Sequence, residues 1–126
     1  MAMFKVQTKH LTQAQRIFTA YHMPKELHFT NHVQERMMQR QFKLSLDEFA
    51  QYFTMENVTE LQFESNTVKF LVTVAVNKAF NLVYVVSLDG AILTTYLNKP
   101  NQVHICKAPL YKDAIDNNKL ENVLAS

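Results

Sequence analysis

The stretch from residue 82 to residue 97 reads Leu82-Val-Tyr-Val-Val-Ser-Leu-Asp-Gly-Ala-Ile-Leu-Thr-Thr-Tyr-Leu97. Two runs rich in Val, Ile, Thr and Tyr, residue types that favour strands, flank one Asp-Gly pair. Asp-Gly is typical of a two-residue type I′ hairpin, because both central residues of that turn need positive φ. The sequence therefore predicts antiparallel strands over 82–88 and 91–97, with Asp89-Gly90 at the hairpin tip.

The hairpin also predicts which side chains share a face of the sheet. Counting outward from Leu88 opposite Ala91 fixes the register, because a hairpin turn sets the pairing of the strands that it joins. The predicted pairs are Val85 with Thr94, Tyr84 with Thr95, and Val83 with Tyr96. Tyr84 and Thr95 are thus expected on one face.

Two more strands are predicted upstream, over 58–64 and 67–77. In the second, every other residue is apolar, as in a strand that rests one face on a core. The apolar residues expected on that face are Val68, Phe70, Val72, Val74 and Val76. Together the four strands predict an antiparallel β-meander over about residues 57–98.

The preceding part of the chain, about residues 11–56, has helical spacing of its apolar residues and three good helix starts. Ser, Thr and Asn accept hydrogen bonds from the free N–H groups of a first turn, and a Gln or Glu three residues later completes a capping box. The predicted helices are Leu11–Tyr21 with Thr12 and Gln15 as the box, Thr30 or Asn31 to Arg40, and Ser45 to about Met55 with Glu48. The fold class is therefore α+β, with N-terminal helices packed on a four-stranded antiparallel meander.

Length and composition favour a single domain over residues 1–126, since 48% of the residues are hydrophobic and nine Phe and five Tyr can fill a core. Residues 99–126 are expected to be extended or partly helical. Cys106 is the only cysteine, so no internal disulfide can form, and a reducing compartment is favoured. No apolar run has the length of a signal peptide core or a membrane span, so we expect a soluble cytoplasmic protein that does not engage a membrane.

Several classes of chemistry are not indicated. The only glycine, Gly90, lies in a turn, so there is no glycine-rich phosphate loop of the kind found in kinases and dinucleotide enzymes. No His-x-x-x-His pair or carboxylate cluster has metal-ligand spacing, so neither a metal nor another cofactor is expected. The formal net charge of +2 gives little support for a nucleic-acid partner by itself, and the distribution of charge matters more.

One row of polar side chains stands out on the second predicted helix. His32, Arg36 and Arg40 are spaced at i, i+4 and i+8, so they span only about 80° of the helix circumference. Three groups that can carry positive charge repel one another along one ridge, which calls for an anionic partner. That partner is either structural, from Glu35, Asp47, Glu48 or helix carbonyls, or it is a bound phosphate.

The same helix carries a resemblance to a known family. The stretch Phe29-Thr-Asn-His-Val-Gln-Glu-Arg-Met-Met-Gln-Arg40, the helix from Ser45 and the closing strand Ala91-Ile-Leu-Thr-Thr-Tyr96 resemble a group of small bacterial and phage proteins. Their helix reads His-x-x-x-Arg-Met-x-x-Arg, and their last strand ends in an Ile-x-Thr-x-Tyr-like segment. They are similar to the BECR ribonuclease superfamily, which has the fold of RelE and ParE toxins, and the helix also resembles that of phage RegB endoribonuclease.

The resemblance covers about residues 28–97 and implies a RelE-like or BECR-like fold. This chain departs from the pattern after Arg40, where the family has a Gly and an apolar residue and Gln41-Phe42-Lys43 stands here. The implied function is that of a toxin-like endoribonuclease of a phage or mobile element. It would cleave RNA without a metal by attack of the 2′-hydroxyl, leaving a 2′,3′-cyclic phosphate.

That chemistry needs a base near the 2′-oxygen, cations for the charge on phosphorus and an acid for the leaving 5′-oxygen. Histidine exchanges protons near neutral pH and arginine binds phosphate through two N–H groups, which suits His32, Arg36 and Arg40. Thr95 and Tyr96 match the family's second cluster and are the other expected catalytic residues. Tyr84, opposite Thr95, and His28, just before the helix, are the expected substrate-binding residues. The expected partners are RNA, free or ribosome-bound, and an antitoxin or host protein.

Two other interpretations stay open. The first is a non-catalytic phage or plasmid protein that uses this fold to bind and inhibit a host protein, because a fold does not determine a function. The second is the ParE-like case, in which the target is gyrase. Strand Thr and Tyr residues are also common for β-propensity alone, so Thr95, Tyr96 and Tyr84 have a purely structural explanation as well.

Overall fold

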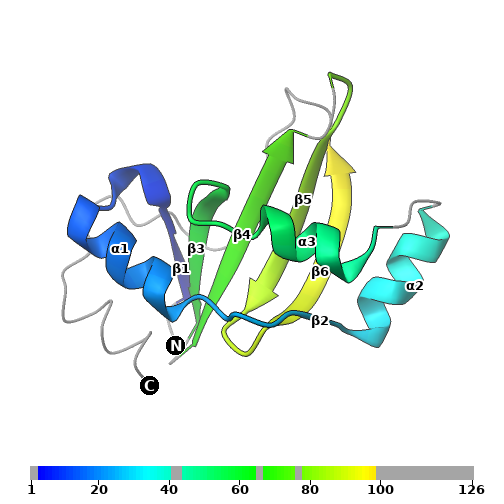
Figure 1. The fold of residues 1–126 in the computed structure, drawn as a ribbon, viewed down its shortest axis with the longest axis horizontal. Coiled ribbons are helices and arrows are strands. Elements are labelled where there is room, and N and C mark those ends of the chain that lie inside the picture. Colours follow the sequence, from blue (N-terminus) through cyan, green and yellow to red (C-terminus); the bar gives the residue numbers. More distant parts are fainter. Residues whose placement is uncertain (1–2, 41–43, 65–66, 76–77, 99–126) are drawn as a thin grey trace.

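The computed structural model describes residues 3–40, 44–64, 67–75 and 78–98, which form three α-helices, one 3₁₀ turn and a sheet of six strands (Figure 1). In chain order the elements are β1 Met3–Gln7, η1 Thr8–His10, α1 Gln13–His22, β2 His28–Phe29, α2 Asn31–Gln39, α3 Leu46–Tyr52, β3 Val58–Glu64, β4 Thr67–Ala75, β5 Asn81–Ser87 and β6 Ala91–Asn98. The predicted α+β class is confirmed. Among these helices, none has the length and apolar character needed to cross a membrane.

The sheet has the strand order β1-β3-β4-β5-β6-β2. Strands β3 to β6 pair antiparallel with their neighbours in the chain, as predicted, and β1 adds antiparallel to β3. The predicted four-stranded meander is present but is only part of the sheet, because β1 and β2 belong to the same sheet. Strand β2 pairs parallel with β6 through only two residues, His28 with Ala91 and Phe29 with Ile92, which is too short to show a period in sequence.

The three predicted helix starts are confirmed by their capping hydrogen bonds. The Thr12 hydroxyl accepts from the backbone N–H of Gln15 at 3.1 Å, and the Gln15 side chain accepts from the N–H of Thr12 at 3.0 Å. Ser45 and Glu48 form the same capping box at the start of α3. The hydroxyl of Thr30 caps α2. Each cap satisfies N–H groups that have no partner inside the helix, so the sequence fixes where these helices begin.

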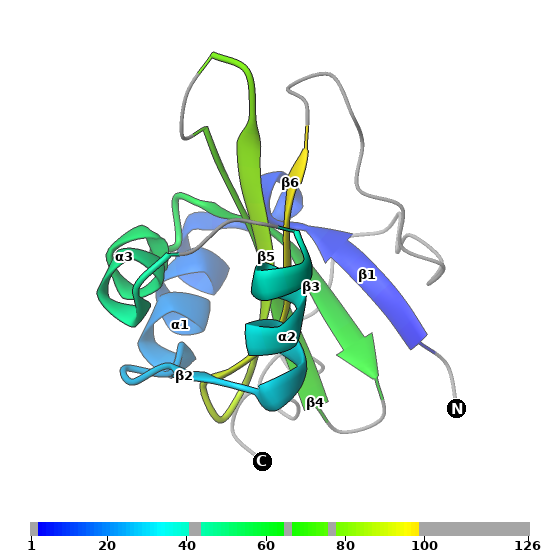
Figure 2. The same cartoon turned by 90° about the vertical axis from the view of Figure 1, so that its right-hand side faces the viewer.

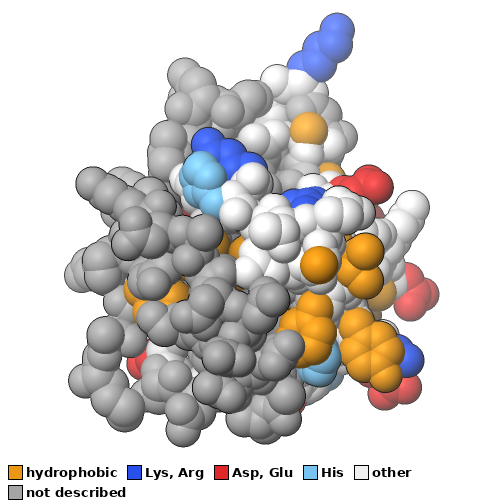
Figure 3. Space-filling view, turned by 90° about the vertical axis from the view of Figure 1, so that its left-hand side faces the viewer, with side chains coloured by type: hydrophobic (Ala, Val, Ile, Leu, Met, Phe, Trp, Pro, Cys, Tyr) orange, Lys and Arg blue, Asp and Glu red, His pale blue; other side chains and the backbone are white. Residues whose placement is uncertain are grey.

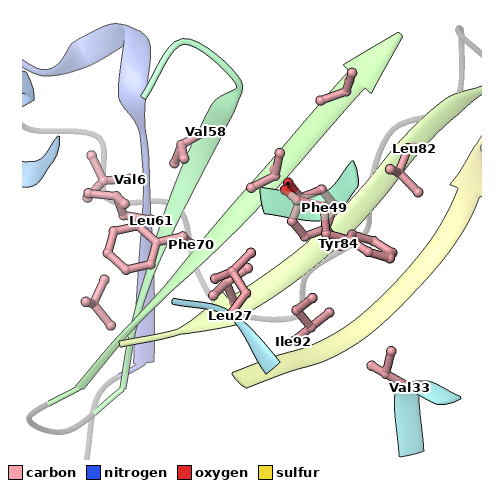
Figure 4. Close-up of a cluster of buried hydrophobic side chains, with 14 of the residues drawn as sticks. Val6, Leu27, Val33, Phe49, Val58, Leu61, Phe70, Leu82, Tyr84 and Ile92 are labelled. Carbon is pink, nitrogen blue, oxygen red and sulfur yellow. Dashed lines mark hydrogen bonds between the residues drawn. The ribbon is translucent and has the colours of Figure 1, made fainter. Parts of the chain in front are cut away.

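The main core lies between the helices and one face of the sheet. Helices α1 and α3 cover that face, and α2 lies beside β6 (Figures 1 and 2). Phe49 of α3 is fully buried at its centre, with its ring 4.9 Å from the ring of Tyr84 and 5.6 Å from that of Phe29, in edge-to-face contact (Figure 4). The apolar residues of β4 point into this core as predicted, apart from Val76, which lies outside the described residues.

The opposite face of the sheet carries a second apolar cluster. Leu71, Val83 and Val85 are buried there, and Leu93 and Tyr96 pack against them. Strands β4 and β5 therefore have apolar residues on both faces, which explains the nearly continuous hydrophobic run of β5.

The β5–β6 hairpin turns one residue earlier than predicted. The N–H of Gly90 donates to the carbonyl of Ser87 at 3.1 Å, so Leu88 and Asp89 are the central residues and Gly90 follows with φ +93°. The predicted pairs of Tyr84 with Thr95 and Val83 with Tyr96 are nevertheless confirmed. The earlier turn and the predicted pairs are compatible, because the register of the two strands shifts by one residue between Val85 and Val86.

Replacing Gly90 by alanine is expected to destabilise the protein by about 2 to 5 kcal/mol. This is the sum of the free-energy cost of a left-handed backbone conformation and the cost of a steric clash. A Cβ atom at this position would lie 2.1 Å from the backbone oxygen of Glu26. Urea unfolding followed by circular dichroism measures the loss. Gly90→Asn separates the two causes, since Asn tolerates positive φ but not the clash. An Asn variant as stable as the wild type would contradict the clash.

Candidate functional site

The row His32, Arg36 and Arg40 lies on the exposed side of α2. His32 directly precedes Val33, and Arg36 directly precedes Met37. Val33 and Met37 are buried in the core, so their packing fixes the rotation of the helix about its axis. At about 100° per residue, the row then runs along the flank of the helix. All three side chains are exposed, as the predicted spacing requires of a surface row.

Helix α2 is held against β6 near both of its ends by hydrogen bonds to strand carbonyls. At the start, the hydroxyl of Thr30 donates to the carbonyl of Ile92 at 2.9 Å. At the end, Nη1 of Arg40 donates to the carbonyl of Thr95. The Arg40 guanidinium carbon also lies 5.9 Å from the centroid of the Tyr96 ring. The row is therefore anchored to the last strand at Arg40, while His32 and Arg36 project from the surface.

His32 and Arg36 contact each other. Nε of Arg36 donates to Nε2 of His32 over a distance of 3.4 Å. In this contact Nε2 of His32 is the acceptor, because an arginine Nε carries a hydrogen and can only donate. An unprotonated imidazole nitrogen at the surface is what a general base requires.

The structural explanation of the row called for carboxylates or helix carbonyls as partners. In the described part of the chain, neither Arg36 nor Arg40 forms an ion pair, and the ion pairs that are present join Lys5 to Glu60 and Lys69 to Glu64. Arg40 satisfies part of its hydrogen-bonding capacity on the Thr95 carbonyl. The row thus keeps donors at the surface that can bind an anion.

Thr95 and Tyr84 lie on the same face of the sheet as predicted, but both are fully buried. The Thr95 hydroxyl donates to the carbonyl of Val83 at 3.2 Å, and the Tyr84 hydroxyl donates to the carbonyl of Phe49 at 2.7 Å. Both hydroxyls are engaged inside the protein, so neither is placed to contact a substrate. The alternation of the strands predicts the shared face, but it does not show that α3 covers it.

Tyr96 and His28 lie apart from the row in different ways. Tyr96 points to the opposite face from Thr95, into the cluster with Val83, and contacts the row through Arg40. His28 is exposed on β2 beside the hairpin tip, where its charge contributes to a lowered pKa of the Asp89 carboxyl. The main cause of that lowering is the hydrogen bond from the Ser87 hydroxyl.

Replacing Tyr84 by phenylalanine is expected to cost about 1 to 3 kcal/mol, because the buried Phe49 carbonyl loses its donor. Burial, and to a lesser extent the nearby Tyr52, raises the pKa of the Tyr84 hydroxyl. A raised pKa means that this residue's contribution is complete below about pH 10, the value for an unfolded chain, and is lost as the pH rises above it. Urea unfolding at pH 8 and pH 11 should therefore show a steeper alkaline loss for the wild type than for Tyr84→Phe. Equal losses would contradict the assignment.

A different surface lies on the side of α1. Ile17 and Tyr21 are 63% and 80% exposed, and Figure 3 shows exposed hydrophobic side chains on that side. A shallow hollow of about 360 Å³ lies between the end of α1 and α3. Its walls include Ala20, Met23, Leu27, Ala50, Phe53 and Met55. No local sequence pattern marks this hollow, because its walls come from two separate stretches of the chain, residues 20–27 and 50–55.

Among the residues that the structure describes, no three His, Cys, Asp or Glu side chains come together in a way that could hold a metal ion. Cys106 and His104 lie outside those residues. Comparisons of the chain with family models, with curated proteins and with solved structures find no match.

Proposed function

We propose that the protein is a metal-independent endoribonuclease of the BECR or RelE-like type, and that its site is the exposed row His32, Arg36 and Arg40. The observation that carries the proposal is that this row has donors at the surface and no carboxylate partner among the described residues. Phosphate groups of RNA fit such a row, because arginine binds them through paired, charge-assisted hydrogen bonds. The position of α2 beside the last strand of the meander also agrees with the order of elements in the resemblance.

In this proposal each residue of the row has its own chemical role. When Arg36 turns from His32 to the phosphate, Nε2 of His32 is released and takes the proton of a ribose 2′-hydroxyl as that oxygen attacks the neighbouring phosphorus. The bond from phosphorus to the 5′-oxygen breaks, and this oxygen leaves after receiving a proton from water. Arg36 and Arg40 hold the non-bridging phosphate oxygens, on which negative charge grows during the reaction. Thr95 and Tyr84 have no chemical step, because their hydroxyls are bound to backbone carbonyls in the core.

The proposal is tested by incubating the purified chain with single-stranded RNA and with translating ribosomes in the presence of EDTA. Cleavage products should end in a 2′,3′-cyclic phosphate, which mass spectrometry distinguishes from an open phosphate. Intact RNA in both preparations would contradict the proposal.

Replacing Arg36 by alanine is expected to lower kcat/KM for RNA cleavage by about 10²-fold, as for loss of one group that stabilises the transition state. Arg36→Lys should recover only part of the rate, because lysine restores the charge but not the two-pronged contact with phosphate. Lys25→Ala removes an exposed cation outside α2 and serves as the matched control. Equal rates for the Arg36→Ala and Lys25→Ala variants would show that general charge, rather than the row, matters.

The second candidate function is binding of a host protein without catalysis, and the exposed Ile17 and Tyr21 favour it. Aromatic side chains are common anchors in protein interfaces. In this case Tyr21→Ala would release a partner that co-purifies with the chain, whereas His32→Ala would retain it. Cleavage of RNA that depends on His32 and not on Tyr21 would favour the ribonuclease instead.

A further inference from the structure

The contact between His32 and Arg36 shows which way the basic nitrogen of the row faces. Nε of Arg36 donates to Nε2 of His32 at 3.4 Å, and Arg36 lies about one helical turn further along α2. Nε2 therefore faces the C-terminal part of the row rather than the start of the helix. A ribose hydroxyl that takes the place of the Arg36 Nε then lies on the C-terminal side of the His32 ring.

Arg40 marks the other end of the row and is held in place there. Its Nη1 donates to the carbonyl of Thr95, and its guanidinium carbon is 5.9 Å from the centroid of the Tyr96 ring. A guanidinium has several N–H donors, so this contact leaves others for an anion. His32 and Arg40 are about 12 Å apart along the helix axis, at about 1.5 Å per residue. A phosphate that contacts Arg36 and the tethered Arg40 therefore lies on the C-terminal side of His32.

We infer that an RNA strand lies along the row with its 5′ side at His32 and its 3′ side at Arg40, an inference that rests on the proposed ribonuclease function. In the transfer, the 2′-oxygen bonds to phosphorus as its proton passes to Nε2 of His32, and the bond from phosphorus to the 5′-oxygen breaks. Water protonates the leaving 5′-oxygen. The attacking and leaving oxygens lie roughly in line on opposite sides of phosphorus. With the 2′-oxygen beside His32, the 5′-oxygen points away from it, toward the end of α2.

The direction of α2 then gives the course of the strand over the protein. Thr30 at the helix start contacts Ile92, and Arg40 at the helix end contacts Thr95, so α2 runs in the same direction as β6 (Figure 2). The nucleotide that carries the attacking hydroxyl lies near the start of α2. The nucleotide that leaves lies near the end of α2, beside the later part of β6.

The same geometry selects an unpaired strand. In a duplex, pairing and stacking fix the backbone, so the 2′-oxygen cannot turn into line with the 5′-oxygen, whereas a nucleotide in a single strand is free to do so. Glu35 adds a charge that opposes a second strand. It is exposed on the side of α2 opposite the buried Val33 and Met37. The phosphates of a second strand would meet its carboxylate there.

The polarity is tested by NMR with the 2′-deoxy dinucleotide TpT, which has a single phosphate and cannot be cleaved because it lacks the 2′-hydroxyl. A nitroxide label at its 5′ end should broaden the backbone amide signals of Asn31 and His32 more than those of Gln39 and Arg40. A label at its 3′ end should give the opposite result. The reversed pattern, equal broadening by the two labels, or no effect on α2 would overturn the inference.

Failure of this inference is distinct from failure of the proposed function, because TpT reports binding alone. Intact RNA in the cleavage assay together with the expected broadening would contradict catalysis but not the orientation of the strand. Arg40→Ala should bind TpT about tenfold more weakly, as when one charge-assisted contact is lost, whereas the control Lys25→Ala should bind it as the wild type does. Equal binding by the two variants would overturn the position assigned to the phosphate.

The preference for an unpaired strand is tested with a 2′-O-methyl RNA, which also cannot be cleaved, both alone and paired with its complement. The wild type should bind the single strand about tenfold more tightly than the duplex. Glu35→Gln should narrow this difference, and Glu56→Gln, which changes an exposed carboxylate outside α2, should leave it unchanged. Equal binding of single strand and duplex by the wild type would overturn the selection of an unpaired strand, and an unchanged difference in Glu35→Gln would remove Glu35 from that selection.

Discussion

Replacement of His32 by alanine is expected to reduce the rate of RNA cleavage by about 10²- to 10⁴-fold, the usual contribution of a general acid or base. The reason is that His32 is the member of the row that can take up a proton, and its Nε2 lies at the surface beside Arg36. No alternative base stands in the row, because the other two members are arginines, which stay protonated. Single-turnover cleavage of a labelled RNA measures the loss.

The matched control is His10→Ala. His10 is also exposed, but it lies in η1 next to β3, several strands away from α2 in the sheet. Both substitutions should change the free energy of unfolding by no more than about 0.5 kcal/mol, as is usual for exposed positions. A rate for His32→Ala within twofold of that for His10→Ala would remove His32 from the mechanism and leave the row, at most, as a binding surface.

Replacement of Phe49 by alanine is expected to lower the free energy of unfolding by about 3 to 5 kcal/mol. The ring is fully buried and makes edge-to-face contacts with Tyr84 and Phe29, which lie on β5 and β2. Alanine would leave a cavity where α3 meets the sheet. The loss is a large part of the roughly 5 to 15 kcal/mol that stabilises a typical domain.

Urea unfolding monitored by circular dichroism measures this effect, with Gln51→Ala as the control on the same helix. Gln51 is exposed, so its replacement should have little effect on stability. A loss below about 1 kcal/mol for Phe49→Ala would mean that α3 does not hold the core together as the contacts indicate.

The elements that could be predicted from sequence are those whose signals are local. Thr12 and Ser45 fix helix starts through hydrogen bonds that span three residues, and the alternation in β4 is visible within one strand. Strand β2 could not be predicted, since two residues have no period and its partner, β6, is more than sixty residues away. The hairpin tip was misplaced by one residue because Asp-Gly also suits a longer turn in which only the glycine needs positive φ.

The candidate site also has one part that local sequence patterns predict and one part that they do not. The exposed row on α2 follows from helical spacing, so His32, Arg36 and Arg40 were predictable as a group. The burial of Thr95 and Tyr84 was not, because it depends on where the helices dock: Tyr84 bonds to Phe49 of α3, and α2 lies along β6, which carries Thr95. Nor does any pattern in the sequence show that Arg40 reaches the Thr95 carbonyl across fifty-five residues.

The contact between Arg40 and Thr95 also bears on how the protein avoids sticking to itself. Among the described strands, β2 covers β6 only at Ala91 and Ile92, so the rest of that outer margin has no neighbouring strand. An exposed edge strand has unpaired backbone groups that can pair with strands of other molecules and start aggregation. Here α2 lies along the margin, and the Arg40 guanidinium occupies a carbonyl that an incoming strand would need. Helix α2 and its terminal Arg40 thus block this edge of β6 from pairing with a strand of another molecule.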